Sequence, residues 1–450
     1  GSEMCIRDRA GPVHGGPMAK RKSSPECSLL RKLLGLLNLT IVWFRIQPLK
    51  GVLHLGVKPY KNGACCPQCG RRCKLAGRSR RTRTIRDVPV CGLSVCIHYA
   101  PREIRCPTHG RVQELIPWAS PKARHTLRLE YEVLRLCRTT TQKEAAATLG
   151  LPTSTVADIL HRSVERLREG HRIRGLKRIG IDEISYRRGH RYLTVVYDLE
   201  RHHVVWVGRG RARDTIDRFF REHMSPGQRS RVEVACCDMS PTYIGAIRDH
   251  LPGARLVLDR FHVIKALNEA VDEVRKELWR SLDRAGRKEL KGLRFILLKN
   301  AANRTDAERR ALASIARSHR RLHRATVLKD ELSLLWESEG PAAAERFLKR
   351  WCKSALLSRN EPIRRFVATV KNHWDGILAS ICGVTNAVAE GLNRVIRMVK
   401  NRASGYRGTD NFSNMIYLVV GDLDLPAQIG RENRTRQQKV HTHRDLCCGV

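Results

Sequence analysis

The chain has no apolar run long enough to span a membrane. Its most apolar stretch, LLGLLNLTIVWF at 33–44, falls short of the roughly 18–20 residues that a transmembrane helix needs. The first residues are polar and charged and lack the apolar middle of a secretion signal. A glycine-rich loop that would cradle phosphates and a repeat of roughly 20–50 residues are also missing. We therefore expect a cytoplasmic protein with no membrane partner, and neither a P-loop enzyme nor a solenoid.

Acidic residues are scarce relative to basic ones. The 450 residues include 44 Asp and Glu against 85 Lys and Arg, which gives a formal net charge of +41. Such an excess repels itself in a compact protein, so a polyanionic partner is expected. The basic residues are spread along the whole chain, which favours nucleic acid over a membrane surface. The length predicts roughly two to four domains.

Cysteine is abundant, with 16 residues in a chain that has no secretion signal, which favours metal ligands over disulfides. Cys66-x-x-Cys69 and Cys106-x-x-His109 each lie in a turn that contains proline or glycine. Together they supply the four nitrogen and sulfur ligands of a tetrahedral structural Zn²⁺. Cys65 could replace Cys66 as a ligand. The alternative to a metal site is that these cysteines are simply buried and bind no metal.

The segment between the two pairs, TIRDVPVCGLSVCIHYAPREIRC, alternates like a strand hairpin. Three further cysteines near the two pairs are expected to pack in the interior rather than bind metal: Cys73, Cys91 and Cys96.

The stretch TQKEAAATLGLPTSTVADILHR predicts a helix-turn-helix. Thr141 or Gln142 starts a short helix with small alanines, Gly150 ends it, and Pro152 and Thr153 open the next helix. In such a motif the second helix enters the major groove, and its early residues face base edges. Those residues are Ser154 and Thr155. An ordinary helical hairpin is the alternative.

From residue 177 the pattern changes to strands. Three short β-branched runs are followed by helix, strand, helix, strand and helix, which predicts a mixed sheet with helices on its faces, as in RNase H-like domains. From about 265 to 380 the strand signals disappear, which predicts an all-helical insertion. A late helix follows in TNAVAEGLNRVIRMVKNR, with an apolar stripe expected at Val388, Leu392, Val395, Ile396 and Val399.

Three acids stand at distinctive places in this layout: Asp182 in the first strand, Asp238 at the end of the fourth, and Glu390 on the late helix. Carboxylates there can hold two divalent cations for phosphodiester chemistry. A single strand-end aspartate is more often a cap, and Glu390 alone is a solvated helix residue. Asp198 and Glu183 are competitors, with Glu183 ranked lower because it points to the opposite face from Asp182.

Four stretches in this order resemble the DDE transposases of bacterial insertion sequences, in particular the ISL-three family: GIDEISYRRGHRYLTVVYDLE, CCDMSPTYIGAI, LVLDRFHVIKALNEAVDEVRKE and TNAVAEGLNRVIRMVKNRASGYR. With the metal ribbon and the helix-turn-helix, the resemblance covers roughly residues 30–420. It implies a transposase that binds terminal inverted repeats of double-stranded DNA and catalyses strand cleavage and strand transfer.

The resemblance also implies the site. It places a DDE triad with two Mg²⁺ or Mn²⁺ ions at Asp182, Asp238 and Glu390, and a supporting Asp-x-x-His signature at Asp259 and His262. Chemistry on paired element ends implies a homodimer or a higher oligomer on DNA. Basic residues beside Glu390 are candidates for phosphate contacts, with a solvated basic face as the alternative: Arg394, Arg397 and Lys400.

The expected fold is therefore an α/β multidomain protein. Its segments are a disordered leader or assembly scar (1–28), a zinc-ribbon-like domain (29–120), a helix-turn-helix domain (121–172), an RNase H-like core (173–264), an all-helical insertion (265–380), the closing helix of the core (381–425) and a basic tail (426–450). Two other functions remain open: a non-catalytic DNA-binding regulator or inactive relic, and an RNase H-type nuclease.

Overall fold

The computed structural model describes residues 24–36, 39–59, 63–79, 81–169, 173, 175–187, 191–382, 387–406, 408–423 and 425. The chain divides into two compact units, residues 1–170 with 423–450 and residues 171–422. The tail expected at 426–450 lies outside the described residues, as does most of the expected leader. Residues 24–28 of the expected leader are described and structured, because helix α1 (Pro25–Leu33) buries Cys27. Within the described residues every helix is too short or too polar to cross a bilayer.

The first unit contains a four-stranded sheet in the order β1-β2-β6-β5. Its strands are β1 (Leu39–Gln47), β2 (Val52–Pro59), β5 (Arg83–Val90) and β6 (Leu93–Tyr99). Leu55, Ile85 and Ile97 alternate with more exposed residues and are fully buried, which gives the sheet its core. The predicted hairpin is therefore present as β5–β6, but it belongs to this sheet and not to the one that carries the Cys66 and Cys106 turns.

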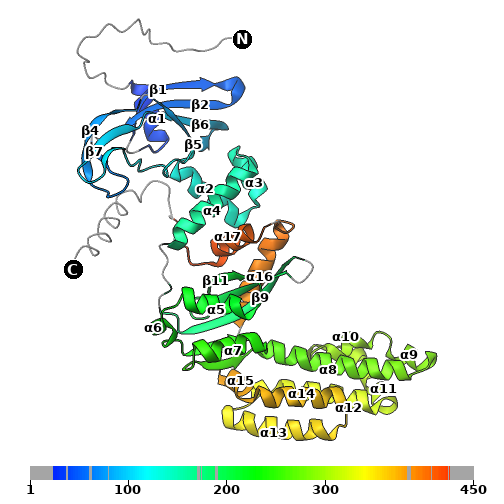
Figure 1. Cartoon of the computed structure of the whole chain (residues 1–450). Coiled ribbons are helices and arrows are strands. Elements are labelled where there is room, and N and C mark those ends of the chain that lie inside the picture. The colour runs from blue at the N-terminus through cyan, green and yellow to red at the C-terminus, as the bar shows by residue number, and fades with distance from the viewer. Residues whose placement is uncertain are drawn as a thin grey trace, which may run out of the picture. The chain divides into compact units, whose positions relative to one another are not determined.

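A second, smaller sheet follows the order β3-β4-β7-β8 (Figure 1). It consists of β3 (Ala64–Cys65), β4 (Arg72–Arg78), β7 (Arg102–Cys106) and β8 (Gly110–Gln113). Its apolar interior is minimal: the buried apolar residues are Ala64, Cys66, Ile104 and Cys106, and Arg102 of β7 is buried in an ion pair with Glu114. A sheet with so little apolar surface depends on something other than burial to hold its turns.

Three helices close the first unit: α2 (Leu127–Thr139), α3 (Gln142–Leu149) and α4 (Thr153–Glu169). Thr141 caps α3, and its hydroxyl and Glu144 form a reciprocal capping box. Gly150 ends α3 in the left-handed region at φ +58°, where a side chain would be strained. The predicted start and end of α3 and the predicted start of α4 are confirmed.

The second unit is built on a five-stranded mixed sheet in the order β11-β10-β9-β12-β13. Its strands are β9 (Arg178–Arg187), β10 (Arg191–Asp198), β11 (His203–Arg209), β12 (Val234–Cys237) and β13 (Arg255–Leu258). The first three form an antiparallel meander, and β12 and β13 run parallel to β9 and to each other. This is the strand succession that the sequence predicts.

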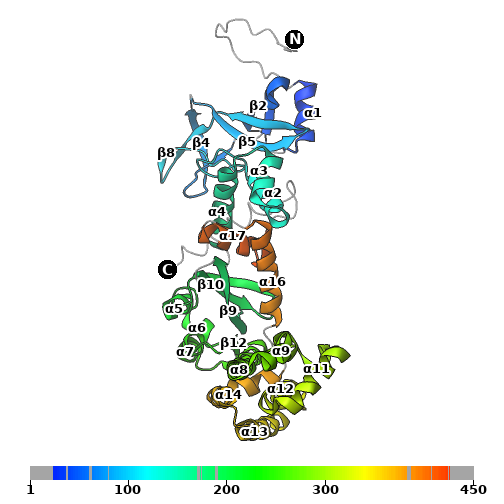
Figure 2. The same ribbon diagram turned by 90° about the vertical axis from the view of Figure 1, so that its right-hand side faces the viewer.

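Helices cover both faces of this sheet (Figure 2). On one face, α7 (Pro241–His250) hydrogen-bonds the sheet through Tyr243 and Thr194, whose side-chain oxygens are 3.1 Å apart, with α5 (Arg213–Glu222) beside it. On the other face, α16 (Ala387–Arg402) accepts a bond from Tyr197, and α17 (Thr409–Val420) lies against β11. The short helix α6 (Pro226–Arg229) precedes β12.

A helical array separates β13 from α16. Its helices are α8 (Arg260–Ser281), α9 (Arg284–Leu290), α10 (Leu293–Leu298), η2 (Ala301–Asn303), α11 (Asp306–Ser318), α12 (Arg320–Ser333), η3 (Leu334–Glu337), α13 (Pro341–Leu357), α14 (Glu361–Asn372), α15 (Trp374–Ala379) and η4 (Ser380–Cys382). It packs on the sheet edge at Gly376, where a Cβ would lie 2.7 Å from Leu258 Cγ. The helical region begins at Arg260, earlier than the boundary expected at 265.

Candidate active site and metal centre

Three aspartates lie at the same level across three neighbouring strands of the mixed sheet. The parallel register pairs Cys236 with Gly180, so two residues further along Asp238 is level with Asp182. The register of β12 with β13 pairs Cys237 with Leu258, so Asp259 is level with Asp238. The Asp259 amide donates to the Cys237 carbonyl at 3.0 Å and extends that ladder by one bond. Strand topology alone therefore gathers these acids at one end of the sheet.

Asp182 is held by two hydrogen bonds. Its Oδ1 accepts from the Glu183 amide at 2.7 Å, and its Oδ2 accepts from Asn393 Nδ2 at 2.6 Å. Asn393 is 4% exposed on α16, and its Oδ1 accepts the Tyr197 hydroxyl. Burial raises the pKa of Asp182, and the neighbouring Asp238 and Asp259 add to the rise. The orientation of this carboxylate is fixed from both the strand and the helix.

Asn393 and Tyr197 were not anticipated from the sequence. The buried stripe of α16 runs through Ala389, Asn393, Ile396 and Val399. The predicted stripe is therefore partly wrong, because three of its five members are only half-buried: Val388, Leu392 and Val395. The available signal was a polar residue at helical spacing from Ala389 and Ile396.

Glu390 lies one turn before Asn393 on α16 and is exposed. Burial raises the pKa of Glu390, and the charges of Asp259 and Asp182 raise it further, against the lowering effects of His262 and Arg397. These interactions bring Glu390 into the same electrostatic cluster as the strand-end acids. Glu390 therefore lies one turn from Asn393, the residue that hydrogen-bonds Asp182, and close enough to Asp182 and Asp259 for their charges to raise its pKa.

Asp259 and His262 lie where β13 passes into α8. Asp259 is 5% exposed and caps α8 by accepting the Phe261 amide at 3.0 Å. His262 Nε2 is 3.9 Å from Asp259 Oδ2. Both residues thus lie near the acids. Asp259 is level with Asp238 on one neighbouring strand, just as Asp182 is on the other.

The two competing acids have other partners. Glu183 Oε1 accepts the Tyr243 hydroxyl at 3.0 Å on the α7 face, and burial raises the pKa of Glu183. Asp198 is buried at the end of β10, where its Oδ1 accepts the amides of Glu200 and Arg201 at 2.9 Å each. Glu183 does point away from the face that carries Asp182, and Asp198 caps a turn.

The basic residues of α16 differ in their contacts. Arg394 and Arg397 are exposed, and Arg397 is close enough to Glu390 and Tyr197 to affect both electrostatically. Lys400 is half-buried, and its Nζ donates to the Ser185 carbonyl at 2.9 Å. Arg394 and Arg397 are therefore available to an external anion, whereas Lys400 ties α16 to β9.

Four side chains in the small sheet converge as metal ligands do. The ligand atoms of Cys66, Cys69, Cys106 and His109 all lie within 4.8 Å of one another. His109 Nδ1 is 3.6 Å from the sulfurs of both Cys66 and Cys106, and Cys69 Sγ is 3.6 Å from Cys106 Sγ. A tetrahedron with Zn–S bonds of about 2.3 Å places its ligands roughly 3.5–3.8 Å apart. The four predicted residues are thus brought together, and the three distances of 3.6 Å fall within that range.

The two turns that carry these ligands have the same sequence pattern. Each reads Cys-Pro-x-Cys/His-Gly, and the closing glycines Gly70 and Gly110 have φ +72° and +68°. Burial tends to raise the pKa of the Cys106 thiol, but hydrogen bonds from His109 and the Thr108 amide outweigh it and lower the pKa to about 6. A thiol so disposed is readily deprotonated, which a metal ligand must be.

The other cysteines near the ribbon lie outside this cluster. Cys65 is in β3 and pairs with Arg72 in the ladder, so the structure favours Cys66 as the ligand. Cys73 donates to the Arg71 carbonyl at 3.3 Å, and Cys96 is half-buried in β6. Cys91 is exposed in the β5–β6 turn with φ +50°, so the expectation that it packs in the interior is wrong.

The predicted base-reading residues lie at the start of α4. Ser154 is exposed and Thr155 is half-buried. Val156, Ile159 and Leu160 form the buried face that packs on α2 and α3. The first turn of α4 therefore presents Ser154 to solvent, with Thr155 at the edge of the packed face.

Known proteins resemble the chain over most of its length. A family model described as "Transposase" matches residues 179–416, and one described as "Helix-turn-helix domain of transposase family ISL3" matches residues 114–164. The transposase for insertion sequence element IS1001 of Bordetella parapertussis is 32% identical over 368 residues, which cover 80% of this chain and 89% of that protein. The transposase for IS1557 of Mycobacterium tuberculosis is 28% identical over 393 residues, 82% and 88% of the two chains.

Among solved structures, the Drosophila P element transposase strand transfer complex aligns with a TM-score of 0.35 at 11% identity, covering 66% of this chain and 92% of that one.

The family model described as "Transposase" spans more than half of the chain, and the IS1001 relative exceeds 30% identity over most of it. The predicted helix-turn-helix is confirmed by the second family model. The chain belongs to transposase family ISL3, the ISL-three family of insertion-sequence transposases.

Proposed function

We propose that the mixed sheet is an RNase H-like catalytic domain whose triad is Asp182, Asp238 and Glu390. One observation carries the proposal: the strand register levels Asp238 and Asp259 with Asp182, and α16 hydrogen-bonds Asp182 through Asn393, one turn from Glu390. Two neighbouring carboxylates at such a position repel each other unless a cation or a proton lies between them. A structural role alone would not require this arrangement.

The donor set suits Mg²⁺ or Mn²⁺. All three groups offer hard carboxylate oxygens, which these ions prefer, and desolvation raises the pKa of Asp182 and of Glu390, which disfavours their charge in the absence of a cation. Asp182, Asp238 and Glu390 would hold two ions. Bound there, the ions would supply Lewis-acid activation of the attacking oxygen and neutralise charge on the phosphate that is cut.

The remaining residues position these groups. Asn393 fixes the Asp182 carboxylate and is itself oriented by Tyr197. Asp259 and His262 support the site from the start of α8. Arg394 and Arg397 contact backbone phosphates of the DNA end. No nucleophilic serine or tyrosine is required, because water frees a 3′-hydroxyl that then attacks the target strand.

Metal dependence tests the triad most directly. The intact chain is expected to cleave a duplex that carries the terminal inverted repeat when Mg²⁺ or Mn²⁺ is present, and to stop when EDTA is added. Readdition of the ion restores cleavage. The measurement is the rate of appearance of 3′-hydroxyl ends. Cleavage that persists unchanged in EDTA would exclude the proposed carboxylate site.

Recognition of the repeat is assigned to α4. Replacement of Ser154 and Thr155 by alanine is expected to weaken binding to the repeat by roughly tenfold, about what one lost base contact costs. Binding to unrelated duplex should not change, because the phosphate contacts remain. Gel-shift titrations of both duplexes measure the difference. An equal loss of affinity for both duplexes would show that these residues contact the DNA phosphate backbone and not the bases.

The chain is further proposed to bind a structural Zn²⁺ at Cys66, Cys69, Cys106 and His109, and to act as a homodimer or higher oligomer on paired DNA ends.

A non-catalytic DNA-binding regulator is the second candidate function. The complete set of acids favours the enzyme, because a regulator has no use for it. Mass photometry of the complex with repeat DNA measures the number of protomers, and a single protomer on paired ends would contradict the assembly.

A further inference from the structure

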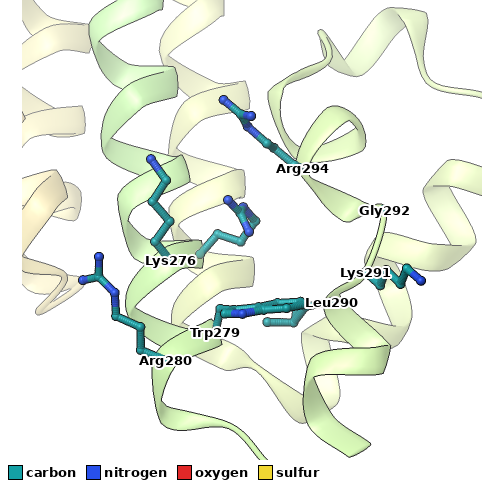
Figure 3. Close-up of a pocket in the computed structure, with 8 residues that line it drawn as sticks. Lys276, Trp279, Arg280, Leu290, Lys291, Gly292 and Arg294 are labelled. Carbon is teal, nitrogen blue, oxygen red and sulfur yellow. The ribbon is translucent and has the colours of Figure 1, made fainter. Parts of the chain in front are cut away.

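A basic pocket lies in the helical array, between the last turns of α8 and the segment that joins α9 to α10 (Figure 3). Its volume is about 380 Å³, at the lower end of the roughly 300–1,000 Å³ typical of small-ligand sites. Trp279 is 19 positions after Arg260 on the same helix, so the pocket lies roughly 30 Å along the axis from Asp259. The pocket is therefore separate from the acids.

An aromatic ring forms the floor of the pocket. Figure 3 shows the Trp279 indole lying against Leu290, which is 1% exposed. The other face of the ring is turned to the open space, and Trp279 is half-buried overall. Among the described residues no group accepts a hydrogen bond from its indole N–H. A flat apolar surface next to a free donor suits a planar ligand with polar edges.

Cations surround this floor. Arg275, Lys276 and Arg294 converge on the buried Asp272, with N–O distances of 2.8, 3.0 and 3.5 Å. Arg280 and Lys291 also line the pocket, and no carboxylate in the described part of the chain lies within ion-pairing distance of either. One carboxylate against five cations leaves the pocket strongly positive, so the planar ligand should carry negative charge.

We propose that this pocket binds one unpaired nucleotide of a DNA strand, with the base stacked on Trp279 and the adjoining phosphates on Arg280 and Arg294. A duplex interior offers no free base face, so a duplex would use only the cations and leave the open face of the Trp279 ring uncovered. The proposal rests on the proposed function only in that DNA is the polymer expected at the chain. A free mononucleotide shares the same chemistry and must be distinguished by experiment.

The test compares binding of single-stranded and duplex probes by the full chain in EDTA, where the triad cannot act. The probes are a fluorescein-labelled oligothymidine and the same strand paired with oligoadenosine. Trp279→Ala is expected to weaken binding of the single strand by roughly 5- to 100-fold, whereas Trp279→Phe, which can still stack, stays within about threefold of wild type. Duplex affinity should not change in either variant.

A charge variant gives a second, independent measurement. Arg280→Ala with Arg294→Ala should lower the salt dependence of single-strand binding by roughly 1.4 in log–log slope, as expected for two lost phosphate contacts. Asp272 remains paired with Arg275 and Lys276 in this variant. The matched control is Arg346→Ala with Arg350→Ala, two exposed arginines on α13, which removes the same charge and should leave the slope nearer that of wild type.

Three outcomes would overturn the inference. They are wild-type single-strand affinity in Trp279→Ala, equal loss in Trp279→Ala and Trp279→Phe, and an equal change of slope in the two arginine pairs. Displacement of the strand by thymidine monophosphate at micromolar concentration, dependent on Trp279, would reject the strand as the ligand and assign the pocket to a free nucleotide. Loss of cleavage in Mg²⁺ has no bearing on this test, so the two proposals can fail separately.

Discussion

Replacement of Asp182 by asparagine is expected to lower strand cleavage and strand transfer by at least roughly 10³-fold, because a ligand to a catalytic cation contributes several kcal/mol and each 1.36 kcal/mol is a factor of ten in rate. The substitution keeps the shape of the side chain. Its carbonyl oxygen can still accept from Asn393 Nδ2, as Asp182 Oδ2 does at 2.6 Å. Single-turnover cleavage of the repeat duplex in Mg²⁺ measures the loss.

The same substitution should not destabilise the fold in EDTA. Burial raises the pKa of Asp182 above its unfolded value, so this group favours folding at low pH and loses that contribution as the pH rises through the folded pKa. At neutral pH the ionised carboxylate is therefore a cost, and a neutral asparagine removes it. We expect Asp182→Asn to unfold at the same urea concentration as wild type or a higher one. A variant that loses both activity and stability would point to a structural role.

Glu183→Gln is the matched control, because it neutralises the adjacent carboxylate on the opposite face. Glu183 contacts Tyr243 and lies 3.8 Å from Arg211, both away from α16. Its loss should reduce cleavage by less than about tenfold, the lower limit for outer contacts around a metal site. If Glu183→Gln were inactive and Asp182→Asn active, the first acid of the triad would be Glu183.

Local patterns predicted the elements of this chain and the ligands within them. The β-branched runs separated by turns predicted the strands of the mixed sheet, and Thr141 and Gly150 predicted the ends of α3. The two Cys-Pro turns predicted the metal cluster because spacing and turn chemistry are local properties. Each of these features depends on neighbours in the sequence.

The contacts that the patterns could not predict join distant parts of the chain. Asn393 is buried only because Tyr197 and Asp182 satisfy its amide, and these lie 196 and 211 residues away. Without those partners a buried amide would cost about 1–3 kcal/mol. The helical periodicity therefore predicts apolar residues, and not Asn393, on the buried face of this helix.

Removal of Zn²⁺ is expected to unfold the small sheet of the first unit and leave the helix-turn-helix folded. Apart from the proposed metal ligands, its buried apolar interior consists of Ala64 and Ile104, and burying one large aliphatic side chain contributes only about 1.5–3 kcal/mol. Structural zinc contributes apparent binding free energies of roughly 10–16 kcal/mol in zinc-finger peptides. Hydrogen exchange before and after chelation should show protection lost in β3, β4, β7 and β8 and kept in α2 to α4.

Substitution of the ligands separates the metal from the general effect of losing a thiol. Cys66→Ser should lose the bound zinc and the protection of the small sheet together. Cys65→Ser, one position earlier in β3, should retain one zinc per chain, because Cys65 lies outside the cluster. Metal content by mass spectrometry decides between them. Zinc that stayed with Cys66→Ser and left with Cys65→Ser would transfer the ligand to Cys65.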